Sequence, residues 1–156
     1  MSAIFTAKLS LALFTEEEDL TTKLHTMLKG QDDIEATFFD SLEKFQDHIK
    51  TENVNMAFCD IDGDKYGPKH SQELMRELIG LKRGTCYIAM SNDIKIINLT
   101  TLYRLGVFGH LFKSASHHDF GAELKRACEN VSSWKHNFDQ VLADKSMERE
   151  LEDLFG

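Results

Sequence analysis

The sequence predicts an α/β fold class: a single, doubly wound, five-stranded parallel sheet flanked by helices. Short apolar runs alternate with stretches whose apolar residues recur every three or four positions, as strands and helices do in such a sheet. The run Val54–Cys59 is almost continuously apolar, which is typical of a central strand covered on both faces. Three runs lead directly into a polar residue, namely Asp60, Ser91 and Lys113.

The first three predicted elements are a strand, a helix and a second strand. Leu9 to Phe14 is an apolar run of strand length, and Ile34 to Phe39 is rich in residues that favour strands. Between them, the stretch from Glu17 to Leu28 has helical spacing. Its apolar face consists of Leu20, Leu24, Met27 and Leu28.

The second helix and the central strand follow. Asp40 is the expected capping residue of this helix, because Glu43 follows three positions later. Its predicted apolar side consists of Leu42, Phe45 and Ile49. The central strand Val54–Cys59 then leads into a loop from Asp60 to Pro68, and Pro68 suits the first turn of the next helix.

The remaining elements complete the alternation. The third helix has an apolar face of Leu74, Met75, Leu78 and Ile79. Cys86 to Met90 is the fourth strand, Ile94 to Leu105 is a weaker helix, and Gly109 to Phe112 is a short fifth strand. A last helical pattern begins near Ser116, with Ser116 and Asp119 as candidate caps.

Size and charge narrow the classes of function. The 156 residues, 42% of them hydrophobic and 28% charged, fit one globular domain with a substantial core. The formal net charge of −8 and the pI near 5.3 argue against nucleic-acid binding, which usually needs a basic face. No apolar stretch approaches the roughly 20 residues that a membrane helix needs, so no membrane partner is expected.

The cysteines and the N-terminus indicate a cytoplasmic location. Cys59, Cys86 and Cys128 are odd in number and lack CxxC spacing, so we expect buried, unpaired thiols in a reducing compartment. The first residues lack the basic segment and long apolar stretch of a secretory signal.

Asp60, Ser91 and Lys113 are expected to lie close together. The carboxyl ends of parallel strands meet at one edge of a sheet, and this edge is the usual place for a binding site in such folds. A carboxylate, a hydroxyl and an ammonium group together suit the handling of a phosphoryl group.

Together with acids after the first strand, these three residues resemble the receiver domain of two-component response regulators, a flavodoxin-like fold. The acids are Glu16, Glu17, Glu18 and Asp19. The resemblance covers residues 8 to about 130 and rests on the order of residues along the elements rather than on one motif. It implies a stand-alone signalling protein that is not an enzyme beyond its own phosphorylation and dephosphorylation.

The resemblance implies a role for each residue. Asp60 would be the phosphoacceptor for a phosphohistidine on a histidine kinase or phosphotransfer protein. Lys113 would pair with one phosphoryl oxygen, and Ser91 would bind another and shift upon phosphorylation. His110 stands where receivers often carry a switching aromatic residue. Output would follow through contact with a downstream protein.

The resemblance also implies a Mg²⁺ site, because receivers hold this ion with oxygen ligands. Its residues would be Glu16, Glu17, Asp60 and Asp62, the last through its backbone carbonyl. The acidic pair of the family corresponds either to Thr15 and Glu16 or to Glu16 and Glu17. Thr15 in the first position would remove one metal carboxylate.

Two other functions are compatible with these residues. The acidic pair is altered and the loop after Asp60 is long and acidic, which is similar to a pseudo-receiver, a phosphorylation-independent binding module. The run from Asp60 to Asp64 is also similar to the first motif of haloacid-dehalogenase-type phosphatases, with Asp60 as nucleophile and Asp62 as general acid/base. Against a phosphatase, two strand–helix units precede Asp60, and Asp64 replaces the threonine of that motif.

Residues 131–156 are predicted to form a helical extension of a receiver-like domain that comprises residues 1–130. Heptad-like spacing relates Ala127, Val131, Trp134, Phe138 and Val141. This extended helix either packs back on its own domain or provides a seam for a homodimer or another partner. The acidic tail that follows has an apolar stripe and either docks in a partner groove or frays.

Overall fold

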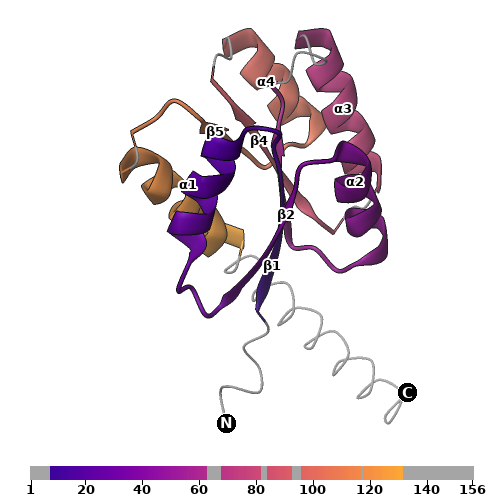
Figure 1. Ribbon diagram of the computed structural model, residues 1–156. Coiled ribbons are helices and arrows are strands. Elements are labelled where there is room, and N and C mark those ends of the chain that lie inside the picture. Colours follow the sequence, from indigo (N-terminus) through magenta and orange to yellow (C-terminus); the bar gives the residue numbers. More distant parts are fainter. Residues whose placement is uncertain (1–7, 63–67, 82–83, 93–95, 117, 132–156) are drawn as a thin grey trace, which may run out of the picture.

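The computed structural model describes residues 8–62, 68–81, 84–92, 96–116 and 118–131, which form a sheet with helices on both faces (Figure 1). All five strands are parallel, in the order β2-β1-β3-β4-β5. The predicted fold class is therefore confirmed, and the central strand β3 is the one that carries Asp60.

Strands and helices alternate along the chain. The strands are β1 (Leu9–Phe14), β2 (Ile34–Phe39), β3 (Met56–Asp60), β4 (Cys86–Ser91) and β5 (Gly109–Phe112). The helices are α1 (Glu18–Leu28), α2 (Leu42–Thr51), α3 (Pro68–Leu81) and α4 (Ile96–Leu105), and residues 118–131 are also helical. Asp60 and Ser91 are the last residues of β3 and β4, one position further than the predicted strand ends.

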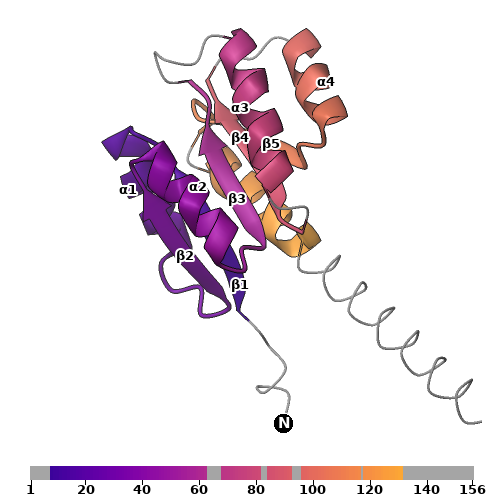
Figure 2. The same ribbon diagram turned by 90° about the vertical axis from the view of Figure 1, so that its right-hand side faces the viewer.

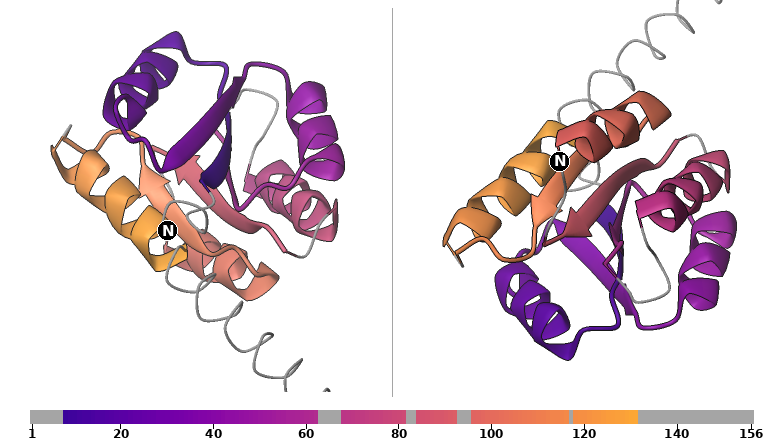
Figure 3. Two further views of the ribbon diagram at one scale, coloured as in Figure 1. Left: turned by 90° about the horizontal axis from the view of Figure 1, so that it is seen from below. Right: turned by 90° about the horizontal axis from the view of Figure 1, so that it is seen from above.

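The register of the strands brings the polar residues to one edge of the sheet. Asp60 pairs with Met90 across β3 and β4, and Ser91 pairs with Phe112 across β4 and β5. We call the edge at which the strands end the carboxyl edge, and the right-hand view of Figure 3 looks down on it. Neighbouring strands therefore deliver the carboxylate of Asp60, the hydroxyl of Ser91 and, directly after β5, Lys113.

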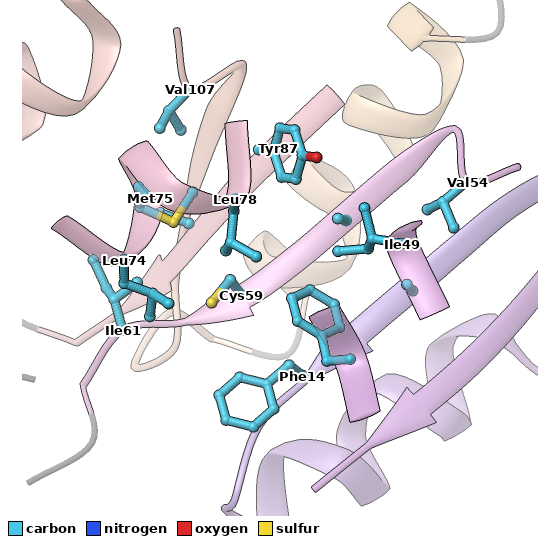
Figure 4. Packing of buried hydrophobic residues seen from close by; sticks show 14 of the residues in the cluster. Phe14, Ile49, Val54, Cys59, Ile61, Leu74, Met75, Leu78, Tyr87 and Val107 are labelled. Atoms are coloured by element: carbon cyan, nitrogen blue, oxygen red, sulfur yellow. The ribbon is translucent and has the colours of Figure 1, made fainter. Parts of the chain in front are cut away.

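Alternation along the strands divides the core into two layers. Figures 2 and 3 show the helices that cover the sheet. One layer joins the sheet to α2, α3 and α4, through Phe14, Phe45, Ile49, Cys59, Leu74, Met75, Leu78, Tyr87 and Leu102. Figure 4 shows part of this layer, with Phe14, Cys59 and Met75 among the labelled residues. The other joins it to α1 and residues 118–131, through Leu11, Leu13, Leu20, Leu24, Phe58, Met90, Leu111, Phe120 and Leu124. Both faces of β3 are covered, as its continuous apolar run predicts.

Two predictions of helix caps need correction. α2 begins after Ser41, whose Oγ accepts a hydrogen bond from the backbone N–H of Lys44 at 3.4 Å, so the expected cap Asp40 is wrong. Adjacent Asp and Ser are both good caps, and the helix starts one residue later than expected. At the last helix, Ser116 is the cap, because its Oγ accepts from the backbone N–H of Asp119 at 3.1 Å. Asp119 thus lies inside the first turn.

The three cysteines are unpaired, as predicted. Cys59 and Cys128 are buried, whereas Cys86 is only half-buried. Burial raises the pKa of the Cys59 thiol, with the adjacent Asp60 adding to the effect. Burial also raises the pKa of Cys128 to about 11, with smaller contributions from Asp33 and Glu129. Raised pKa values keep these thiols protonated and unreactive at neutral pH.

The C-terminal extension is described only in part. Residues 118–131 are helical, and Ala127 and Val131 pack into the second core layer, so these two seam positions contact their own domain. The remaining seam positions and the acidic tail lie outside the described residues, and a homodimer through them stays a prediction. Within the described ranges, no helix is long and apolar enough to span a membrane.

Candidate functional site

The carboxylate of Asp60 is held by donors from three parts of the chain. Its Oδ2 accepts a hydrogen bond from Thr15 Oγ1 at 2.6 Å. Its Oδ1 accepts from Lys113 Nζ and from the backbone N–H of Asp62, each at 3.0 Å. The residue is only 5% exposed, so these contacts fix the orientation of a nearly buried carboxylate.

The ammonium group of Lys113 joins three carboxylates. Nζ lies 2.6 Å from Glu17 Oε1, 3.0 Å from Asp60 Oδ1 and 3.2 Å from Asp62 Oδ2. Burial alone would lower the pKa of Lys113, but the hydrogen bonds with Glu17, Asp60 and Asp62 outweigh it and raise this pKa. Lys113 therefore remains a cation throughout the physiological range.

The segment after Lys113 is tied to α1 by Lys23. Its Nζ donates to the backbone carbonyl of Ala115 at 3.2 Å and lies 3.5 Å from that of Lys113. The same ammonium lies 4.3 Å from the centre of the Phe120 ring, a cation–π distance. These contacts hold the backbone that carries Lys113 in place.

Ser91 is bonded to His110 rather than to Asp60. Ser91 Oγ and His110 Nε2 are 2.6 Å apart. Burial lowers the pKa of His110 to about 4, although the charge of Asp62 acts in the opposite direction. The imidazole is therefore neutral at pH 7, and its Nδ1 is buried without a hydrogen-bond partner among the described residues.

Four of the predicted site residues come together, whereas Ser91 pairs with His110 and Glu16 joins neither group. Glu17, Asp60, Asp62 and Lys113 form one ion-paired cluster at the carboxyl edge, whereas Glu16 is exposed and outside it. Sequence reasoning missed the backbone N–H of Asn92, which donates to Asp62 Oδ2 at 2.6 Å. A main-chain donor leaves no signal in the residue type.

Thr15, the residue directly after β1, contacts the carboxylate of Asp60. Phe14, the last residue of β1, pairs with Cys59, so Thr15 follows β1 beside Asp60. Thr15 Oγ1 also accepts from the backbone N–H of Glu17 at 3.1 Å. Thr15 therefore contributes a hydroxyl, and Glu17 a carboxylate, to the contacts around Asp60 and Lys113.

The carboxylates of the cluster suit Mg²⁺, but in this structure they already surround the ammonium group of Lys113. Carboxylate oxygens are the ligands that this hard ion prefers, and four acids lie at or beside the site. Among the described residues, no group of three or more His, Cys, Asp or Glu is arranged to hold a metal. Glu17, Asp60 and Asp62 instead surround Lys113. The donor set fits Mg²⁺, provided that one carboxylate releases the ammonium.

The low pKa of His110 predicts a loss of stability in acid. In the unfolded chain His110 takes up a proton near pH 6.5, whereas in the folded chain it does so only near pH 4. The free energy of unfolding therefore keeps the full contribution of the neutral imidazole above pH 6.5 and loses it as the pH falls toward 4. Because solvent screens this partly exposed ring, the loss is smaller than the ~3.5 kcal/mol that about 1.4 kcal/mol per pKa unit would give.

Urea unfolding between pH 7 and pH 4.5 measures this contribution. His110→Gln is expected to flatten the pH dependence relative to wild type. His118→Gln removes an exposed histidine and is expected to leave it unchanged. Parallel pH profiles for wild type and His110→Gln would contradict the burial of a neutral imidazole.

Solved structures with a similar fold include signal receiver domains. A CheY-like receiver domain from Methanospirillum hungatei has a TM-score of 0.67 and 14% identity, with 81% of this chain and 98% of that chain covered. The receiver domain of a LuxO repressor protein from Vibrio parahaemolyticus has a TM-score of 0.68 at 8% identity, covering 82% and 95%. The beryllofluoride-activated NtrC4 receiver domain dimer has a TM-score of 0.65 and 15% identity, with 78% of this chain and 98% of that chain covered.

The chain has the fold of a response-regulator receiver domain. No protein-family model and no curated protein sequence matches it. The phosphatase alternative depends on Asp60 and Asp62. Asp62, the general acid/base of that alternative, already accepts hydrogen bonds from Lys113 and from the backbone of Asn92.

Proposed function

We propose that this chain is a receiver-type signalling domain in which Asp60 accepts a phosphoryl group from a histidine kinase or phosphotransfer protein. The observation that carries the proposal is the 3.0 Å ion pair between Asp60 and Lys113 at the carboxyl edge, beside the end of the strand that carries Ser91. We propose no catalysis beyond its own phosphorylation and dephosphorylation. The three unpaired cysteines fit a reducing compartment, the cytoplasm.

The chemistry needs positioning and charge compensation rather than an elaborate active site. A carboxylate oxygen of Asp60 forms a bond to phosphorus while the bond between phosphorus and the donor histidine nitrogen breaks. Asp60 Oδ2 is the better nucleophile, because a neutral hydroxyl holds it, whereas Oδ1 is bonded to an ammonium. Lys113 then balances the negative charge of the acyl phosphate.

Mg²⁺ would be held by Glu16, Glu17, Asp60 and the backbone carbonyl of Asp62, and would compensate charge on the phosphoryl oxygens. Thr15 provides a neutral hydroxyl at this site where receivers usually have a carboxylate. We therefore expect weaker metal binding than a full acidic pair would give.

Output would pass through Ser91 and His110 to the face formed by α4 and β5. A Ser91 hydroxyl that turns to a phosphoryl oxygen must leave His110, whose partly buried ring then has to find a new arrangement. Close to this ring, Tyr103 is 76% exposed and Phe112 is 47% exposed. Both line a pocket of about 270 Å³ beside His110. An exposed aromatic face of this kind suits contact with a downstream protein.

A phosphorylation-independent pseudo-receiver is the second candidate. It is supported by the Lys113 ammonium among three carboxylates and by Thr15 in place of an acid. Such a module would keep the α4 and β5 face and bind its partner without any change at Asp60.

Incubation with acetyl phosphate and millimolar Mg²⁺, followed by intact mass spectrometry, tests phosphorylation. Wild type is expected to gain one phosphoryl group and Asp60→Asn none, because the amide nitrogen is not a nucleophile. Asp47→Asn, which removes an exposed carboxylate on α2, is expected to behave as wild type. Absence of the modification in wild type would exclude the phosphoacceptor role and leave the pseudo-receiver.

A further inference from the structure

The side chain of Asp62 accepts hydrogen bonds from two donors, which lie directly after two different strands. Its Oδ2 accepts from the backbone N–H of Asn92 at 2.6 Å and from Lys113 Nζ at 3.2 Å. Asn92 directly follows β4, and Lys113 directly follows β5. Asp62 itself follows β3 by two residues, so the contact closes across three neighbouring strand ends.

The two donors form a preformed anion cradle, which we define as the backbone N–H of Asn92 and the ammonium of Lys113. The backbone N–H of Lys113 donates to the carbonyl of Ser91 at 3.0 Å, which joins the two strand ends that supply the donors. A main-chain N–H and an ammonium together recognise a carboxylate or a phosphate oxygen equally well. The occupant in this structure is a carboxylate from the chain itself.

The cradle lies next to the proposed phosphoacceptor. Lys113 Nζ contacts Asp62 Oδ2 and Asp60 Oδ1 at the same time, 3.2 and 3.0 Å away. A phosphoryl group on Asp60 would need these donors for its own oxygens and would add negative charge beside Asp62. The two anions therefore compete for one set of donors.

We propose that the Asp62 side chain is an internal anion that fills the cradle and limits phosphorylation of Asp60 until it is displaced. This inference rests on the proposed function of Asp60. A route for displacement exists, because the Asp62 side chain is 26% exposed whereas that of Asp60 is 6% exposed. Glu17 contacts the Lys113 part of the cradle at 2.6 Å, whereas Asp62 contacts both of its donors.

Titration with inorganic phosphate, without metal, tests the cradle directly in the full chain. The Asn92 amide signal in ¹⁵N NMR reports binding. Asp62→Ala is expected to bind phosphate about tenfold more tightly than wild type, the usual scale of one charge-assisted hydrogen bond. Asp62→Asn keeps a hydrogen-bond acceptor without the charge, and its phosphate affinity is expected to lie between those of wild type and Asp62→Ala. Asp47→Asn removes an exposed charge on α2 and is expected to match wild type.

A second measurement separates this inference from the proposed function. With acetyl phosphate and Mg²⁺, Asp62→Ala is expected to modify Asp60 about tenfold faster than wild type, while the backbone carbonyl of residue 62 is retained. Equal rates and equal phosphate affinities in wild type and Asp62→Ala would overturn the inference and leave the phosphoacceptor intact. If no variant is modified, the phosphoacceptor role fails, and the phosphate titration still decides whether Asp62 fills the cradle.

Discussion

Lys113→Met is expected to lower the free energy of unfolding by about 3–5 kcal/mol at pH 7, the usual cost of removing one partner from a buried ion pair. The Lys113 side chain is 3% exposed and is the common partner of Glu17, Asp60 and Asp62. Methionine fills similar space but leaves these carboxylates facing one another without a cation. Urea unfolding monitored by circular dichroism measures the loss.

Lys125→Met is the matched control for this substitution. Lys125 is exposed on the last helix, and surface changes of this kind alter stability by no more than about 0.5 kcal/mol. Adding Asp60→Asn to Lys113→Met removes the most buried of the stranded charges and is expected to recover part of the stability. If Lys113→Met were as stable as Lys125→Met, the three carboxylates would not depend on the ammonium.

Phe58→Ala is expected to destabilise the domain by about 3–5 kcal/mol, the range for truncation of a buried aromatic residue. Phe58 is fully buried in the central strand β3, two residues before Asp60. The lost contacts belong to the layer that joins the sheet to α1 and residues 118–131. Loss of packing there also loosens the strand that positions the carboxylate.

Phe108→Ala deletes the same side chain at a site that is 42% exposed and is expected to cost less than about 1 kcal/mol. Urea unfolding of the two variants gives their denaturation midpoints for comparison. The dependence of the unfolding free energy on urea concentration is checked for each variant. Equal midpoints would mean that β3 does not form the centre of the core.

The strands were predictable because burial selects long apolar runs wherever a strand is covered on both faces. The run Val54–Cys59 is an example of such a prediction. The run located the central strand, and the structure places four of its residues, from Met56 onward, in β3. The strand ends were less predictable, because Asp60 and Ser91 are polar and yet continue the ladder by one residue.

The polar contacts of the site depended on geometry that residue types do not encode. Thr15 and Glu17 are both near the end of β1, and only the chain path decides that the hydroxyl meets Asp60 while Glu17 reaches Lys113. Asn92 acts through its main chain, which is the same in every residue. The bond between Ser91 and His110 likewise needed the register of β4 and β5, since these residues are far apart in sequence.

The strand order has a consequence for synthesis of the protein. β1, β2 and β3 are the first three strands in the chain, and β1 pairs with both of the others. The ribosome adds residues from the N-terminus to the C-terminus, and a domain generally folds as a unit. Asp60 therefore emerges long before Lys113, and until the last strand arrives the nascent chain holds a carboxylate whose counter-ion has not yet been made.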